Sequence, residues 1–210
     1  MIQSHFGITH APFTQSEPPL LTRQKEVLQE LQVHCHHRGF CLVAGQPGTG
    51  KTVLRKAFAQ AKSRFGFRLT HYSVMGNHLH AIVEANDQRA LTRGMTGLLV
   101  RMARALNKHW SRRGRVFADH FHQHQLTKPR EVRNALAYVL NNARHHNYRI
   151  DTLDYYASGL WFDGWAIHIE ITGSASSWPP SVAPPTTWLL RKGWRPHGRI
   201  RTFETPGQAA

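Results

Sequence analysis

The spacing of apolar residues along the chain predicts alternating helices and strands. Apolar residues that recur at helical intervals predict helices over about 22–37, 50–65, 87–110 and 127–146. Short apolar runs predict strands at 40–45, 67–75, 78–85 and 114–126. Gly76 and Asn77 suit the tight turn of a hairpin, so the strands on either side of them are expected to pair antiparallel. After Asp151 the pattern weakens, and only one short helix that ends at Gly193 is expected.

Basic residues gather in the middle of the chain. The 210 residues carry a net charge of +15, of which +11 falls in residues 63–150, with 15 Lys and Arg against 4 Asp and Glu. Lys and Arg that neutralise phosphates release counterions, so this excess favours a nucleic acid as partner. A soluble protein that is merely basic is the alternative. The two cysteines imply no disulfide framework. Neither a leader peptide nor a membrane-spanning run is apparent, so a cytoplasmic location is expected.

The stretch "GQPGTGKT" has the spacing of a phosphate-binding loop. Glycines let backbone amides curl around an anion, a lysine reaches the outer phosphates, and a threonine hydroxyl can bind magnesium. The apolar run before it and the helix expected after it fit this motif. The sequence therefore predicts phosphate binding, with ATP as the candidate ligand. The residues assigned to this site are Gly45, Gly48, Gly50, Lys51 and Thr52.

Nucleotide hydrolysis needs more than this loop. An acidic residue on a second strand must hold magnesium and position water, and only Glu84 and Asp163 are available, neither in a persuasive context. Through "SHFGITHAPF" and "LLTRQKEVLQEL", residues 1 to about 53 resemble the start of AAA-type ATPases found in mobile elements and secretion-associated operons. The resemblance stops just after Thr52, so an active motor is not expected.

A second motif is the stretch "HYSVMGNHLHAIVEA". Alternate residues of a strand face the same side, so His78 and His80 are expected to project together while Leu79 points into the core. Two neighbouring imidazoles can bind a divalent metal ion. Taken alone this signal is weak, because the chain has 16 histidines and "HFHQHQ" repeats the alternation.

The helix expected downstream adds a tyrosine. The stretch "REVRNALAYVLNNARHH" places Tyr138 and Asn142 four residues apart, on one helix face. A tyrosine on the metal-facing edge would be a nucleophile, and the amide of Asn142 would complete the metal site. A phenol with a pKa of about 10 is a poor nucleophile at neutral pH. A nearby cation would lower that cost and polarise the phosphate under attack.

Together with "GRVFADHFH", these stretches resemble the single-tyrosine HUH transposases, especially the REP-associated tyrosine transposases and their insertion-sequence relatives, over about 58–146. The resemblance implies that His78 and His80 bind Mg²⁺ or Mn²⁺, with Asn142 as the third protein ligand. It implies that Tyr138 attacks a phosphate of single-stranded DNA and leaves a 5′-phosphotyrosine and a free 3′-hydroxyl. It also implies homodimers that act on hairpin-forming DNA ends without ATP.

Two features depart from that family. Phe117 and His120 stand where its Trp-x-x-Arg-Phe motif has Trp and Arg. The family's first strand and much of its first helix have no counterpart, and the ATPase-like piece joins inside a helix near 53–58. The expected fold is α+β: a ferredoxin-like core with an antiparallel sheet and helices on one face. The strand at 40–45 and the helix after the phosphate loop would replace the missing elements.

Three segments are therefore expected: an ATPase-like segment at 1–57, a transposase-like core at 58–150 and a Trp- and Pro-rich tail at 151–210. Arginines of the central helix and the loop after it are candidates for tracking a DNA backbone, although a solvated surface is the alternative for any one of them. These candidates are Arg93, Arg101, Arg104, Arg112, Arg113 and Arg115.

Three hypotheses about function follow. The first is a metal-dependent enzyme that nicks and joins DNA through Tyr138, with activity reduced by the replaced start of the core. The second is an ATP-binding fragment of an AAA-type ATPase with a basic DNA-binding extension and no catalysis. The third is an inactive hybrid that binds DNA through charge alone.

Overall fold

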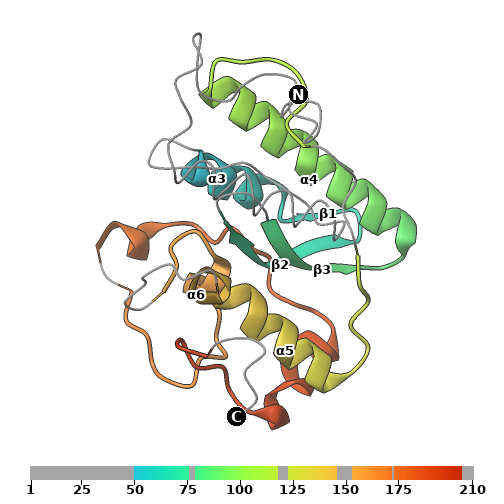
Figure 1. The fold of residues 1–210 in the computed structure, drawn as a ribbon. Helices are drawn as coiled ribbons and strands as arrows, with labels where there is room; N and C mark the ends of the chain where they lie inside the picture. Colours follow the sequence, from blue (N-terminus) through green and yellow to red (C-terminus); the bar gives the residue numbers. More distant parts are fainter. Residues whose placement is uncertain (1–49, 76–78, 118–122, 146–152, 172, 205–210) are drawn as a thin grey trace.

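A computed structural model describes residues 50–75, 79–117, 123–145, 153–171 and 173–204. In this part of the chain three antiparallel strands form one sheet in the order β1-β2-β3, with β1 at Ser63–Arg64, β2 at Phe67–Val74 and β3 at Leu79–Ala85. Helices α3 (Lys51–Ala61) and α4 (Gln88–His109) lie on one side of the sheet, and α5 (Pro129–Leu140) lies on the other with the C-terminal tail (Figure 1).

The predicted hairpin is confirmed as β2 and β3, which pair antiparallel from Phe67 opposite Ala85 to Val74 opposite Leu79. Leu79 is 6% exposed and belongs to the core, as expected. β2 is buried along nearly its whole length, which is typical of a strand covered on both faces. The expectation of helices on one face only is therefore wrong, because α5 and the tail cover the second face.

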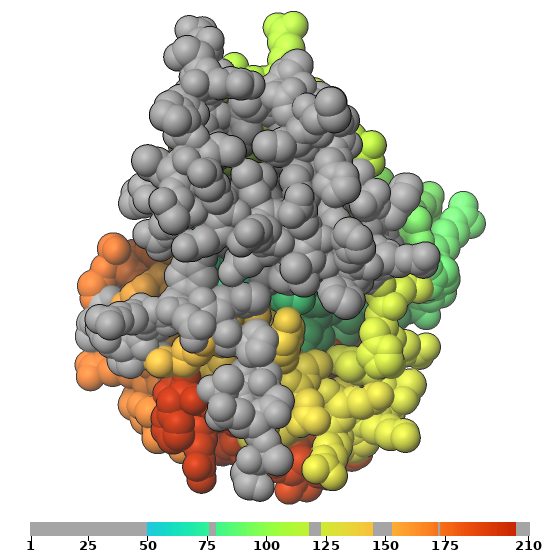
Figure 2. Space-filling model, viewed as in Figure 1, coloured from blue at the N-terminus to red at the C-terminus, as the bar shows by residue number. Residues whose placement is uncertain are grey.

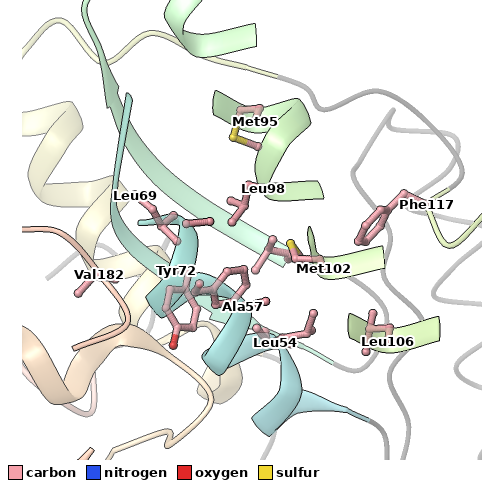
Figure 3. Packing of buried hydrophobic residues seen from close by; sticks show 14 of the residues in the cluster. Leu54, Ala57, Leu69, Tyr72, Met95, Leu98, Met102, Leu106, Phe117 and Val182 are labelled. Atoms are coloured by element: carbon pink, nitrogen blue, oxygen red, sulfur yellow. The ribbon is translucent and has the colours of Figure 1, made fainter. Parts of the chain in front are cut away.

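The first face carries one apolar core, formed where α3 and α4 pack on β2 (Figure 3). Leu54 and Phe58 of α3 meet Leu98 and Met102 of α4, and all four are almost completely buried. The helices predicted at 50–65 and 87–110 are confirmed with slightly shorter bounds. α4 begins after Asp87, whose carboxylate accepts a hydrogen bond of 2.6 Å from the Ala90 amide.

α3 is continuous across residues 53–58, where the ATPase-like and transposase-like resemblances meet. The division of the chain at 57 stays a prediction, since the segments expected at 22–37 and 40–45 lie outside the described residues. Residues of α3 on both sides of that division belong to the same core. Ala57 and Phe58, on either side of it, are 4% and 0% exposed.

The second face carries another apolar core, in which α5 packs with the tail. Leu136 of α5 and Trp194 of the tail are both 0% exposed, and Ile82 of β3 and Trp165 join them. The tail is built from short helical turns rather than long elements. These are η1 (Ser158–Trp161), η2 (Gly173–Ser177), η3 (Leu189–Gly193) and η4 (Arg195–His197).

Two predicted elements differ from the structure. Residues 114–117 and 123–126, the described parts of the strand expected at 114–126, form no strand. Side chains occupy the carbonyls that a strand ladder would use: Arg112 donates to the Arg115 carbonyl at 2.6 Å, and Arg115 donates to the Phe117 carbonyl at 2.7 Å. Gly114 also has a left-handed φ of 100°.

The helix expected over 127–146 is divided in two. α5 ends at Leu140, and α6 (Asn142–His145) follows as a separate short helix. Asn141 lies between them, and its side-chain amide donates a hydrogen bond of 3.0 Å to the Arg201 carbonyl of the tail. A tertiary contact that helical periodicity does not encode therefore fixes this position. Among the described helices, none is long and apolar enough to cross a membrane.

Candidate active site at His80 and Tyr138

A histidine of β3 and a tyrosine of α5 meet across the second face of the sheet. The Tyr138 hydroxyl lies 3.4 Å from Nε2 of His80. Their ring centroids are 4.9 Å apart, with the rings nearly perpendicular at 82°. Both residues line one groove of the molecule. His78, the other histidine of the expected pair, lies outside the described residues.

Local sequence explains how α5 presents this tyrosine. Pro129 occupies the first turn of the helix, where its missing N–H costs nothing. The carboxylate of Glu131 accepts the backbone N–H of Thr127 at 2.9 Å and that of Lys128 at 3.1 Å, which closes the start of the helix. The apolar side of α5 packs into the second core, so the half-buried Tyr138 lies at the boundary between core and groove.

Burial raises the pKa of the Tyr138 phenol. The protein surroundings alone therefore disfavour the phenolate that would attack a phosphate. Nε2 of His80 lies within hydrogen-bond distance of this hydroxyl, and a neutral imidazole can accept a phenolic proton. A cation near the hydroxyl would act in the same direction.

Asn142 is the first residue of α6, four positions after Tyr138. It is 0% exposed, and neither Oδ1 nor Nδ2 has a hydrogen-bond partner among the described residues. A buried amide without partners is costly, so its presence is typical of a group kept for a ligand. An amide oxygen and an imidazole nitrogen are both donors that suit Mn²⁺, and the oxygen also suits Mg²⁺.

The described residues by themselves contain no cluster of three or more His, Cys, Asp or Glu that would hold a metal ion. His80 lines the groove and Asn142 does not, and each carries a donor that fits a metal ion. The role of His78 as a further ligand stays a prediction.

The groove around His80 and Tyr138 has a volume of about 1900 Å³. A small-molecule pocket is usually smaller, roughly 300–1000 Å³, so this groove suits an extended ligand better. β3, α5 and the end of the tail form its walls. In Figure 2, α5 and the tail both reach the surface in the lower half of the molecule. Its basic side chains are Arg130, Arg133, Arg199 and Arg201.

None of these four arginines was a sequence candidate. The six predicted arginines lie elsewhere, and the described lining of the groove includes none of them. Arg93, Arg104 and Arg113 are exposed, whereas Arg101 donates to the Gly97 carbonyl of its own helix at 3.1 Å. Arg112 and Arg115 hold the loop after α4 through the carbonyl contacts described above. Their role in DNA binding stays a prediction.

The phosphate loop is described only from Gly50 onward, since Gly45 and Gly48 lie outside the described residues. Gly50 precedes α3 with a left-handed φ of 87°, and a Cβ there would press on the Leu106 side chain of α4. The Lys51 ammonium lies 4.6 Å from the centroid of the Tyr156 ring in the tail. Burial lowers its pKa, and Asp154 offsets part of this effect. Thr52 is exposed.

The two acidic residues considered as partners of that loop are engaged with the tail. The Glu84 carboxylate accepts hydrogen bonds from the amides and hydroxyls of Thr186 and Thr187, at 2.7–3.0 Å. Burial acts to raise the pKa of Glu84, but these hydrogen bonds outweigh burial and hold the pKa below its usual value. Asp163 pairs with Arg195 at 2.8 Å. Both carboxylates thus have structural partners.

Comparison with known proteins bears on the same part of the chain. The family model described as "Transposase IS200 like" matches residues 47–142. The match includes His80 and Tyr138, ends at Asn142 and begins within the phosphate loop. No curated protein matches the chain, and no solved structure does. The family match supports a transposase-like function for this part of the chain, with DNA as its partner.

Proposed function

We propose that the protein cleaves and rejoins single-stranded DNA through a covalent bond to Tyr138, at a metal site formed by His78, His80 and Asn142. The observation that carries this proposal is the 3.4 Å distance between the Tyr138 hydroxyl and Nε2 of His80. The tyrosine comes from a helix 58 positions downstream of the histidine, and both open onto a groove that suits an extended ligand.

In the cleavage step the Tyr138 oxygen attacks a phosphorus atom of the strand. A bond between phosphorus and the tyrosine oxygen forms, and the bond from phosphorus to the 3′ oxygen breaks. The phenolic proton passes to a base, either Nε2 of His80 at 3.4 Å or solvent, and the departing 3′ oxygen takes up a proton. Joining reverses this step, because a 3′-hydroxyl attacks the phosphotyrosine and the tyrosine leaves.

A bound Mg²⁺ or Mn²⁺ would polarise the phosphate and favour the tyrosine anion. The chain places His80 3.4 Å from the Tyr138 hydroxyl. Asn142 follows Tyr138 by four positions, and its buried amide has no hydrogen-bond partner among the described residues. A nitrogen that binds a cation cannot accept a proton at the same time. His80 therefore acts as a ligand or as a base, but not as both in one step.

The proposal extends to substrate and assembly. Hairpin-forming DNA ends are the expected substrates and a homodimer the expected assembly. The phosphate-loop unit would supply the first strand and helix of the core. α3 supports this last point, because it packs against α4 and β2 as a core helix. Nucleotide binding by the loop has no comparable support among the described contacts.

Covalent capture tests the reaction. A single-stranded oligonucleotide labelled at its 3′ end is incubated with protein and Mg²⁺ or Mn²⁺, then separated under denaturing conditions. Because the tyrosine takes the 5′ phosphate, the 3′ label is expected to migrate with the protein, whereas a 5′ label is expected on a shortened free strand. Tyr138→Phe is expected to abolish both products.

Tyr155→Phe is the matched control, since Tyr155 is a tail tyrosine that is 44% exposed. It is expected to form the adduct like the wild-type protein. An adduct that persists in Tyr138→Phe, or a wild-type protein that forms none with either metal, would contradict the proposal.

A further inference from the structure

The end of the tail presents two arginines and a phenylalanine to the groove that holds Tyr138. Exposed and buried residues alternate here: Ile200 and Thr202 are 0% and 9% exposed, whereas Arg199, Arg201 and Phe203 are exposed. The three exposed residues line the groove and the two buried ones do not. We call residues 199–203 the tail ledge. Phe203 is 64% exposed, and its ring is the exposed aromatic side chain among the described residues that line this groove.

The backbone of the tail ledge is fixed on both sides. Ile200 pairs with the segment around Trp165, donating to the Gly164 carbonyl at 3.1 Å and accepting from the Ala166 amide at 2.8 Å. On the other side, Asn141 donates to the Arg201 carbonyl at 3.0 Å. The tail ledge is thus attached directly to the end of the helix that carries Tyr138.

A second link joins the tail ledge to α5. Arg133 of α5 forms an ion pair with Glu204 through both guanidinium nitrogens, directly after the ledge. The backbone that carries Arg201 and Phe203 is therefore fixed, while both side chains stay exposed. This is the arrangement expected of a preformed binding surface.

The acidic residues of the groove are already engaged within the protein. Glu204 is neutralised by Arg133, and Glu84 accepts the hydrogen bonds of Thr186 and Thr187. Asp87 caps α4. Among the described residues, neither Arg199 nor Arg201 forms an ion pair with these carboxylates. Glu204 nevertheless lies near Arg201, because its carboxylate accepts the Arg201 backbone N–H at 3.4 Å and the Arg201 charge helps to lower its pKa. The Arg201 guanidinium lies 5.9 Å from the centroid of the Phe203 ring, so cation and aromatic face occur together.

We propose that the tail ledge binds the DNA strand beside the phosphate under attack, with Phe203 stacking on an unpaired base and Arg199 and Arg201 contacting phosphates. An aromatic ring beside arginines is how proteins bind single-stranded nucleic acid with little sequence preference. A base within a duplex offers no free face to such a ring, so the ledge selects single strands. This inference rests on the proposed function, and it lies in residues that the family match does not cover.

The test measures equilibrium binding of a labelled single-stranded oligonucleotide of mixed sequence, by fluorescence anisotropy, in the Tyr138→Phe background so that no covalent step interferes. Phe203→Ala is expected to weaken binding about 10-fold, and Phe203→Trp to restore it. Phe65→Ala is the matched control, because Phe65 is 85% exposed but does not line the groove, and binding is expected to be unchanged. Arg201→Gln is expected to lower the salt dependence by about one phosphate contact.

Three results would overturn the tail ledge: wild-type affinity in Phe203→Ala, equal weakening in Phe65→Ala, or duplex DNA that competes as well as single strands. Each is separate from the covalent test. If the adduct forms at Tyr138 while Phe203→Ala binds normally, DNA binding by the tail ledge is wrong and the proposed reaction is supported. If no adduct forms but Phe203→Ala weakens binding, the reaction fails and the ledge stands.

Discussion

The two motifs of this chain, the histidine–tyrosine site and the phosphate loop, lie in different surroundings. His80 and Tyr138 meet at the wall of an open groove. Lys51, the phosphate-loop lysine, lies against the Tyr156 ring of the tail, and Gly50 packs against α4. A motif supplies chemistry only where its polar atoms can reach a ligand. By that criterion the contacts of Gly50 and Lys51 favour a role in packing, whereas His80 and Tyr138 line a groove that a ligand could enter.

The same comparison can be made between two histidines on neighbouring strands. His71 of β2 and His80 of β3 belong to paired strands, yet His71 is buried and His80 is only partly so. The Ser158 hydroxyl lies 3.4 Å from Nδ1 of His71, and the Phe162 and His71 ring centroids are 5.4 Å apart with the rings nearly perpendicular. One histidine is therefore enclosed by the tail and the other faces the groove. Substitutions at the two positions are expected to have different effects.

The largest effect is expected at His80. His80→Ala removes the nitrogen beside the Tyr138 hydroxyl, so the rate of adduct formation is expected to fall about 100- to 10,000-fold, whether the histidine acts as base or as metal ligand. Single-turnover kinetics with the 3′-labelled strand measures this rate. His168→Ala is the control, because His168 is an exposed tail histidine outside the groove. Equal rates of adduct formation in the two variants would show that His80 has no role in the reaction.

The next effect concerns stability and pH at His71. Burial lowers the pKa of His71 to about 4, although Asp163 and Glu84 act to raise it. Between about pH 6.5 and about pH 4 the unfolded chain therefore binds the proton that the folded chain excludes. The contribution is complete above pH 6.5 and is lost as the pH falls toward 4. The expected loss in the free energy of unfolding is roughly 3 kcal/mol.

His71→Gln removes this titration while keeping a polar partner for Ser158. Urea unfolding at about pH 7 and about pH 4.5 measures the loss for each protein, and other groups titrate equally in both. The wild-type protein is expected to lose more than the variant. Since His168 is exposed, His168→Gln is expected to behave like the wild-type protein. If all three proteins lose the same free energy, His71 is not held neutral by burial.

Local periodicity predicted much of this fold but not its tail contacts. The β2–β3 hairpin and α4 follow from alternation and helical spacing, which are properties of neighbouring residues. The interruption at Asn141 depends on the Arg201 carbonyl, 60 positions away, and no local pattern contains it. The described parts of the strand predicted after α4 form no strand, and arginine side chains bind two of their carbonyls.

The site shows the same limit. Spacing predicted one helix face for Tyr138 and Asn142, but α5 ends at Leu140 and Asn142 begins α6. Only the family resemblance related the tyrosine to a histidine on a distant strand. The groove residues of the tail were not predicted at all. Their signal was present in "RIRTF", where exposed and buried residues alternate, but two arginines and a phenylalanine in a tail without a known partner indicate no binding site. The segment becomes a candidate binding site only because the structure shows it attached to α5, beside Tyr138.

The smallest effect is expected at Glu84, one of the two acidic residues considered as partners of the phosphate loop. Glu84→Gln replaces a carboxylate that accepts from Thr186 and Thr187 with an amide, so the free energy of unfolding is expected to fall by about 1–2 kcal/mol. Urea unfolding measures it, with the exposed Glu170→Gln expected to change it by less than about 0.5 kcal/mol. An unchanged stability in Glu84→Gln, together with a thermal shift on adding Mg·ATP that this substitution abolishes, would assign Glu84 to the nucleotide. Because both oxygens of Glu84 accept hydrogen bonds from two tail residues, we expect the carboxylate to hold the tail against β3.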